Sequence, residues 1–183
     1  DGVTGEKVWQ HFLQKNPWIL GYGLDYRYLS ILQREFHASG ADADGSGSVI
    51  TDYLMGDKRF TVFVEVKRPD TALFGTSKQR GNCWRLSSDL MDAVSQILEH
   101  KASGQIRLEQ EELHNEDGEV ITQSGYDSKV ILLIGSWSQL EVIGTNAKER
   151  KIKTKTLELF RRDSRNIEIL TYDELYERAA HIV

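Results

Sequence analysis

Two carboxylates and a lysine in the first half of the sequence have the residue types and spacing of a small metal site. Asp52 lies in a β-prone run at 49–55, and Glu65 and Lys67 lie in a second run at 60–67. Because side chains alternate along a strand, Glu65 and Lys67 share one face of the second run. If the two runs pair as a hairpin, we expect both charged residues to lie on the face of Asp52.

The linker between the runs indicates how they pair. Residues 56–59 (Gly-Asp-Lys-Arg) have the length and chemistry of a four-residue hairpin turn. This turn places Asp52 opposite Phe63, so that Asp52 and Glu65 are diagonal neighbours with Cβ atoms about 7–8 Å apart. Two carboxylates at that separation can bind one small cation, and we predict Mg²⁺ with Asp52 and Glu65 as ligands.

A metal site with only two carboxylates predicts a substrate that carries phosphate. Mg²⁺ binds waters and phosphate oxygens in addition to one or two carboxylates, so the substrate would complete its shell. The ammonium of Lys67 would hold the attacking water or neutralise charge that develops on phosphorus. The backbone carbonyl of Val66 points sideways from the strand and is a further candidate metal ligand.

The same residues also have an interpretation without chemistry. A Glu and a Lys two positions apart on a solvated strand face are common and bind nothing. Here, however, Phe63 precedes Glu65 on that face, and valines occupy the opposite face at 62, 64 and 66. Charges that are buried in apolar surroundings need a partner, and a metal ion would provide one.

Periodicity and capping signals predict four helices. Apolar residues at helical spacing predict a helix at about 5–15 and a second from Ser87 or Ser88 to about residue 101. Asn146 and Thr171 each precede a glutamate by three residues, which is the pattern of a capping box at the start of a helix.

The apolar runs between these helices predict the sheet. A nearly continuous apolar run at 129–135 indicates a strand covered on both faces, and residues 167–170 indicate a short strand. A loop is expected at 39–48, and the acidic segment 105–124 is expected to be an exposed excursion. Together with the hairpin, these elements predict an α/β (α+β) fold, with a central mixed β-sheet flanked by helices.

Composition limits the class of protein. The chain has 183 residues, a mean hydropathy of −0.46 and a net charge of −5, from 23 Lys+Arg against 28 Asp+Glu. We expect one domain over 1–183, excised from a longer chain because it begins at Asp1 without Met. A single cysteine, Cys83, excludes an internal disulfide framework. No membrane span or signal peptide is visible, so we expect a cytoplasmic protein with no membrane partner.

Asp52 followed by Glu65-Val66-Lys67 resembles the D…(D/E)-x-K signature of the PD-(D/E)XK nucleases. Four further segments in order resemble the nuclease domain of the Shedu family of bacterial anti-phage defence proteins: FLQKNPWILG at 12–21, EVKRP at 65–69, DAVSQI at 92–97 and ILTYDEL at 169–175. The resemblance covers nearly the whole chain. It departs from the broad superfamily pattern at Thr51, where a proline often precedes the acid.

This resemblance implies a restriction-endonuclease-like core and Mg²⁺-dependent hydrolysis of DNA phosphodiesters, with Mn²⁺ able to replace Mg²⁺. It also implies a homo-oligomer and a variable N-terminal region with a regulatory role. Asp52, Glu65 and Lys67 are the implied catalytic residues, and Gln96 joins them on the family pattern. Gln96 would orient a metal-bound water or a phosphate, although helix periodicity alone equally allows a surface glutamine. Glu6 is either a third acid or a residue that complements a helix dipole.

Positive charge is concentrated near the C-terminal end. Eight basic residues against three acidic ones give the segment 148–165 a local charge of +5, which could track a phosphate backbone. The alternative is a solvated helix face. Trp84 could add a stacking contact to DNA, although tryptophan is more often a core residue. The basic residues are Lys148, Arg150, Lys151, Lys153, Lys155, Arg161, Arg162 and Arg165.

Other chemistry has little support in the sequence. Residues 42–53 imitate the start of a calcium loop, but Tyr53 stands where the bidentate glutamate belongs. The sequence has neither a histidine pair with zinc-site spacing nor a Walker-type phosphate loop. Two hypotheses remain: a metal-dependent DNA endonuclease, or a catalytically silent nuclease-like fold that serves as a DNA-binding or oligomer-assembly module.

Overall fold

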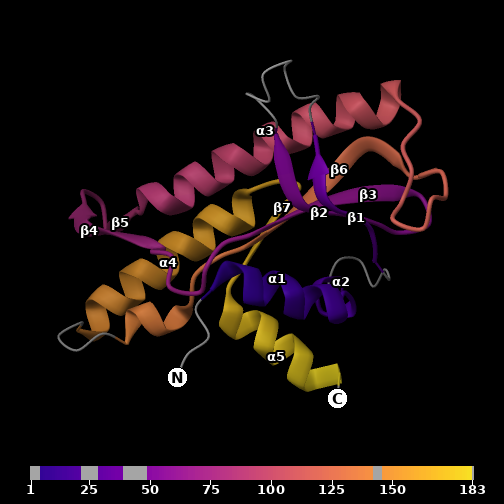
Figure 1. Cartoon of the computed structure of the whole chain (residues 1–183). Coiled ribbons are helices and arrows are strands. Elements are labelled where there is room, and N and C mark those ends of the chain that lie inside the picture. The colour runs from indigo at the N-terminus through magenta and orange to yellow at the C-terminus, as the bar shows by residue number, and fades with distance from the viewer. Residues whose placement is uncertain (1–4, 22–28, 39–48, 142–145, 183) are drawn as a thin grey trace.

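A mixed five-stranded sheet forms the centre of the computed structural model, which describes residues 5–21, 29–38, 49–141 and 146–182 (Figure 1). The strand order is β1-β2-β3-β6-β7. β1 to β3 are antiparallel neighbours, whereas β6 is parallel to β3 and β7 is parallel to β6. The predicted mixed α/β architecture is therefore confirmed, and it is consistent with a restriction-endonuclease-like core. The strands are β1 (Ser30–His37), β2 (Ile50–Gly56), β3 (Phe60–Val66), β6 (Ser124–Leu133) and β7 (Ile167–Leu170).

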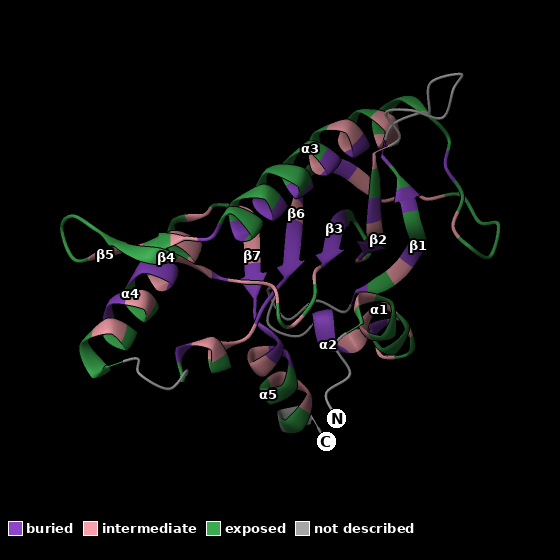
Figure 2. Cartoon of the chain, turned by 60° about the vertical axis from the view of Figure 1, so that its left-hand side comes forward, coloured by how far each residue is buried: buried purple, intermediate pink, exposed green. Residues whose placement is uncertain are grey.

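Helices cover both faces of this sheet, as Figure 2 shows. α1 (Glu6–Lys15), α2 (Trp18–Gly21) and α5 (Tyr172–Ile182) pack on one face. α3 (Ser88–Gln110) and α4 (Ala147–Asp163) contribute to the core on the other face. None of the helices in the described residues is long and apolar enough to span a membrane.

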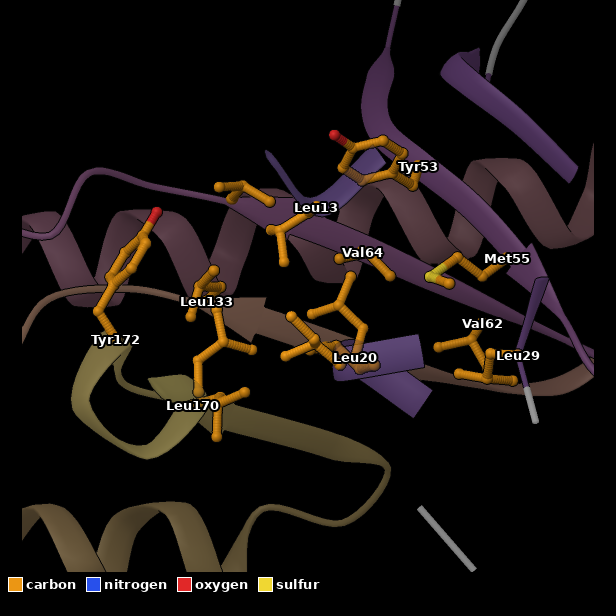
Figure 3. Packing of buried hydrophobic residues seen from close by; sticks show 14 residues of the cluster. Leu13, Leu20, Leu29, Tyr53, Met55, Val62, Val64, Leu133, Leu170 and Tyr172 are labelled. Atoms are coloured by element: carbon orange, nitrogen blue, oxygen red, sulfur yellow. The ribbon is translucent and has the colours of Figure 1, made fainter. Parts of the chain in front are cut away.

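Every second residue of β3 points into the core beneath α1 and α5. Val62, Val64 and Val66 are 6%, 0% and 0% exposed, and their side chains meet Leu13 and Leu20 from the first two helices. Figure 3 shows this cluster of side chains from the sheet and the helices pointing toward one another. Burial on both faces explains why this strand has a nearly continuous apolar sequence.

α3 packs on the opposite face with the apolar stripe that the sequence predicts. Its buried residues include Leu90 and Ile97, and Ile97 packs with Phe63 of β3. The predicted end near residue 101 is wrong, because the helix continues to Gln110 through part of the expected excursion. Gly104 permits this: a Cβ there would lie 2.4 Å from the Phe63 ring, so only glycine allows the close approach.

The predicted helix starts are confirmed by their hydrogen bonds. The side chain of Asn146 accepts a hydrogen bond from the backbone amide of Glu149 (2.9 Å) at the start of α4. At the start of α5, a carboxylate oxygen of Glu174 accepts from the backbone amide of Thr171 (3.0 Å). Both starts depend on local sequence, which is why they were predictable.

The β2–β3 hairpin has a register different from the predicted one. Tyr53 pairs with Val64 and Leu54 pairs with Phe63. Continued by one residue, this register sets Asp52 across from Glu65, so the predicted diagonal arrangement with Asp52 opposite Phe63 is wrong. β2 continues through Gly56, which pairs with Thr61, so the hairpin turns one residue later in the sequence than predicted.

Besides α2, three short elements have no counterpart in the sequence prediction. β4 (Phe74–Gln79) and β5 (Cys83–Leu86) form a separate two-stranded sheet between β3 and α3. η1 (Trp137–Leu140) is a 3₁₀ turn after β6. The predicted loop at 39–48, and with it most of the imitated calcium loop, lies outside the described residues.

Candidate active site

Asp52 lies on β2 at the point where α1 crosses the sheet. Its Oδ2 accepts a hydrogen bond from the backbone amide of Val66 (2.7 Å) on β3. Its Oδ1 accepts from the side-chain amide of Gln10 (2.6 Å) on α1. The carboxylate is thereby oriented by two elements, and the Val66 backbone predicted to be at the site lies directly against it.

Glu65 is the more deeply buried of the two acids, at 4% exposure. Its Oε1 accepts a hydrogen bond from the ammonium of Lys67 (2.8 Å). Its Oε2 lies 3.4 Å from Nδ1 of His100, which is also 4% exposed. Within the described residues, neither Oε2 nor this nitrogen makes a hydrogen bond, so their mutual ion-pair contact is the one polar contact found for this buried oxygen.

Lys67 joins the strand to the helix above it. Besides contacting Glu65, its Nζ donates to Oε1 of Gln96 (2.9 Å) on α3. Its backbone is also held, because its amide donates to the carbonyl of Leu133 (2.8 Å) and its carbonyl accepts from the hydroxyl of Tyr172 (2.6 Å). The four residues predicted from the sequence as catalytic therefore meet at one site.

The two acids have opposite pKa shifts. Burial, followed by the negative charge of Glu65, raises the pKa of Asp52 to about 7. Burial also tends to raise the pKa of Glu65, but its contacts with His100 and Lys67 outweigh burial and lower that pKa. At neutral pH the site therefore combines an ionised Glu65 with an Asp52 that is near its midpoint, a pattern frequent in functional sites.

A second layer of side chains supports Asp52. The Gln10 amide that donates to Asp52 also donates to Oε1 of Glu6 (3.3 Å). The hydroxyl of Tyr53 donates to the backbone carbonyl of Gln10, which fastens α1 to β2. Burial raises the pKa of both Tyr53 and Tyr172, so these hydroxyls stay protonated as donors. Glu6, expected as a possible third acid, is thus linked to Asp52 through Gln10.

The donor set fits a hard divalent cation that takes part of its shell from elsewhere. No group of three or more His, Cys, Asp or Glu side chains with metal-site geometry occurs in the described residues. The site instead offers two carboxylates, and the buried Oε2 of Glu65 accepts no hydrogen bond from the described residues. A positive ion would also relieve the repulsion between Asp52 and Glu65. Mg²⁺ accepts such sparse protein coordination because waters and phosphate oxygens complete it.

An open polar pocket of about 420 Å³ adjoins Asp52. Polar and charged residues from one side of α1 form one wall, and β1 and β2 form the other. This pocket opens to solvent beside a carboxylate that is otherwise largely enclosed. Its lining residues are Lys7, Gln10, His11, Gln14, Arg34, Glu35, Asp52 and Tyr53.

The basic segment 148–165 divides into two groups in the structure. Lys153 forms an ion pair with Glu149 (2.7 Å) and lies over the ring of Trp84, 4.5 Å from its centroid. Arg161 pairs with Glu174 (2.6 Å), and Arg162 donates to Glu158 (2.9 Å). Exposed residues without an ion pair within the described part of the chain are Lys148, Arg150, Lys151, Lys155 and Arg165.

The sequence prediction missed two residues of the site, His100 and Gln10. His100 follows Gln96 by four residues, so helix geometry places both on one face of α3, and this spacing was a usable signal. Gln10 had no such signal, because it is 42 positions from Asp52 and meets it only when α1 packs on the sheet.

Comparison with known proteins adds the family. Residues 4–176 match the family model described as "Shedu protein SduA, C-terminal". The chain belongs to the Shedu family. It is 25% identical over 188 aligned positions to Shedu protein SduA of Bacillus cereus (strain B4264), which covers 98% of this chain and 46% of that relative. The chain thus spans about half the length of this curated relative.

The matched region of this Shedu chain contains the whole candidate site. Thr51, which stands where the broad nuclease pattern often has proline, is fully buried, and its hydroxyl donates to the carbonyl of Val64 (3.0 Å). This bond ties β2 to β3 beside Asp52. Thr51 in place of the proline of the broad nuclease pattern therefore still holds Asp52 in position.

Proposed function

We propose that this Shedu chain is a metal-dependent endodeoxyribonuclease that hydrolyses phosphodiester bonds in DNA. The main support is the meeting of Asp52, Glu65, Lys67 and Gln96, with a buried carboxylate oxygen at Glu65 that accepts no hydrogen bond from the described residues. Two acids and one ammonium match the charge requirements of phosphoryl chemistry, in which an anionic substrate must be bound by cations.

Asp52, Glu65 and the backbone carbonyl of Val66 would hold Mg²⁺, or Mn²⁺ in its place. A bound divalent ion supplies a water of lowered pKa and polarises a phosphate oxygen. Binding of the cation would also convert Asp52 fully to its anion, because positive charge opposes the effects that raise its pKa.

Lys67 would hold the attacking water, and Gln96 would orient it. The ammonium of Lys67 is fixed by Glu65 and Gln96, which leaves one of its three N–H groups for a water or a phosphate oxygen. Hydrolysis forms a bond from the water oxygen to phosphorus and breaks the bond to the leaving oxygen, which takes up a proton. Lys67 would stabilise the charge on the phosphoryl oxygens during this exchange.

The biological setting belongs to the same proposal. Membership of the Shedu family supports a role in bacterial anti-phage defence, in the cytoplasm and with DNA as the partner. The part of the relative that this chain does not span would regulate the activity. A homo-oligomer is also proposed: the exposed side chains of Val8, Phe12 and Tyr176 border an apolar groove of about 380 Å³ between α1 and α5, and such patches often mark interfaces.

Metal binding and cleavage test the proposal together. We would titrate Mg²⁺ and Mn²⁺ into the wild type and Glu65→Gln by calorimetry, and then incubate the same samples with linear and supercoiled DNA. We expect the wild type to bind metal and cut DNA, and Glu65→Gln to lose both properties. Glu112→Gln is the matched control, because its carboxylate side chain is 74% exposed and remote from the site.

Each outcome separates the hypotheses. Metal binding that survives in Glu65→Gln would place the ion elsewhere and contradict the proposed ligands. Cleavage that persists in both Asp52→Ala and Lys67→Ala would contradict the assigned chemistry. If the wild type binds DNA but neither binds metal nor cuts, the alternative of a silent nuclease-like module for DNA binding or assembly would replace the enzyme.

A further inference from the structure

The β4–β5 hairpin is a projection that the proposed chemistry leaves without a role. It forms its own two-stranded sheet, apart from the five-stranded one. Figures 1 and 2 both show it extending beyond the main sheet at the N-terminal end of α3. It connects β3, which precedes Lys67, to α3, which carries Gln96. A ligand that binds the hairpin is therefore held close to the candidate site.

The hairpin is positively charged in a chain that is negative overall. Lys78, Arg80 and Arg85 are all exposed, and no Asp or Glu occurs between residues 71 and 88. The net charge of the whole chain is −5. Within the described residues, Arg80 and Arg85 form no ion pair, so both guanidinium groups are available to an anion outside the chain.

The hairpin is held rigidly against α4. The indole Nε1 of Trp84 donates to the carbonyl of Gly75 (2.7 Å), and the backbone amide of Trp84 donates to Oγ1 of Thr156 (3.0 Å) on α4. Lys153 covers the ring of Trp84. The predicted stacking of Trp84 on DNA therefore gives way to an internal role for the indole in fixing the hairpin.

α4 carries a second group of exposed cations, on a side of the helix away from the hairpin. Lys148, Lys151 and Lys155 are exposed, and their spacing of three and four residues places them on one side of the helix. Lys153 and Thr156, which contact the hairpin, lie on another side. The three exposed cations spread along the hairpin, Lys78, Arg80 and Arg85, match an extended anion better than a small one.

The distance to the site suits a nucleic acid backbone. Gln96 lies eight residues after the first residue of α3, so about 12 Å of helix separates it from the base of the hairpin. Phosphates along one DNA strand are spaced by about 3.4 Å of helix axis, so that length corresponds to roughly three or four nucleotides. A strand whose phosphate occupies the candidate site can therefore reach the hairpin.

We propose that the β4–β5 hairpin is an arm that binds the sugar-phosphate backbone of duplex DNA a few nucleotides from the phosphate at the candidate site. This inference rests on the proposed nuclease function and adds the place where the substrate is held. Arg80 and Arg85 contact phosphates, so the arm contributes affinity that depends on salt and not on base sequence.

The test compares two matched double variants of the chain. Arg80→Ala/Arg85→Ala removes two exposed cations from the arm. Lys58→Ala/Arg59→Ala removes two exposed cations from the β2–β3 turn, at the other end of β3. Binding of a labelled duplex is followed by fluorescence anisotropy in EDTA over a series of salt concentrations, so that no cleavage interferes. Circular dichroism and the melting temperature establish that both variants are folded.

We expect the arm variant to lose affinity and salt dependence, and the turn variant to keep both. The salt exponent is the magnitude of the slope of log binding constant against log salt concentration. Each lost phosphate contact lowers this exponent by about 0.9, so two contacts lower it by about 1.8 and weaken binding by roughly 10- to 60-fold at 0.1 M salt. The arm is refuted if its variant retains the wild-type exponent, or if both variants weaken equally.

Failure of this inference is distinguishable from failure of the nuclease proposal. Wild-type cleavage that needs metal, with equal DNA binding by wild type and arm variant, would refute the arm and leave the enzyme. A loss of DNA affinity confined to the arm variant, with no metal binding by the wild type, would support the arm on a fold that does not cut. Replacement of Arg80 and Arg85 by lysine should restore most of the salt exponent, because the exponent depends on charge.

Discussion

Asp52 provides the sharpest quantitative test of the site, because its pKa is raised to about 7 by burial and by the charge of Glu65. Substitution by asparagine removes the titrating proton and keeps the shape of the side chain. In metal-free buffer we expect the wild type to lose stability relative to Asp52→Asn as pH rises. The unfolded chain releases this proton near pH 3.8, whereas the folded chain holds it until about pH 7.

The sign and size follow from proton linkage. Between these two pKa values the folded state binds more protons than the unfolded state, so the free energy of unfolding falls as pH rises. The full difference between 3.8 and about 7 corresponds to about 4 kcal/mol. Asp52 is partly exposed to solvent, so we expect about half of this, or about 2 kcal/mol between pH 4 and 8. For a chain of 183 residues, 2 kcal/mol shifts the melting temperature by about 4–8 °C.

Urea unfolding in EDTA at intervals between pH 4 and 8 measures the effect. The difference between wild type and Asp52→Asn reports on this group together with its coupling to Glu65, because the remaining acids titrate alike in both proteins. Asp70→Asn is the control, since its side chain is 52% exposed. Parallel stability curves for wild type and Asp52→Asn would refute the reasoning. Addition of Mg²⁺ at pH 8 should then stabilise the wild type and leave Asp52→Asn unchanged.

Three further predictions address neighbouring residues. Lys67→Met should lower the rate of metal-dependent DNA cleavage by about 100- to 1,000-fold, while calorimetry should show metal affinity within about tenfold of wild type; an unchanged rate would remove Lys67 from the chemistry. His100→Ala should leave Oε2 of Glu65 beside a cavity and lower the free energy of unfolding by about 1–3 kcal/mol. The rate of DNA cleavage should fall while DNA affinity without metal stays constant. A loss of DNA affinity would show that His100 has a different role. Gly104→Ala should lower the free energy of unfolding in urea by about 1–3 kcal/mol, because the added Cβ would meet the Phe63 ring. Ser103→Ala is the control at a less buried position of the same helix. If Gly104→Ala stabilised the chain as much as Ser103→Ala, this packing would be contradicted.

The architecture of the site could be predicted where neighbouring residues in the sequence determine it. The helix start at Asn146, the capping box at Thr171 and the buried stripe of α3 were predictable because each depends on residues within one or two helical turns. The pairing of two acids and a lysine on adjacent strands was predictable for a similar reason, since a short turn joins those strands.

The tertiary structure decided which atoms meet. Because β2 continues through Gly56, the hairpin turns one residue later than predicted, and this moved Asp52 from opposite Phe63 to opposite Glu65. Gln10 contacts Asp52 across 42 residues, and His100 reaches Glu65 only because α3 lies on β3. The sequence by itself determined the types of chemical group and most of the elements that carry them. The close packing of α1 and α3 on opposite faces of the sheet determined their distances, burial and charge, because these depend on neighbours that are remote along the chain.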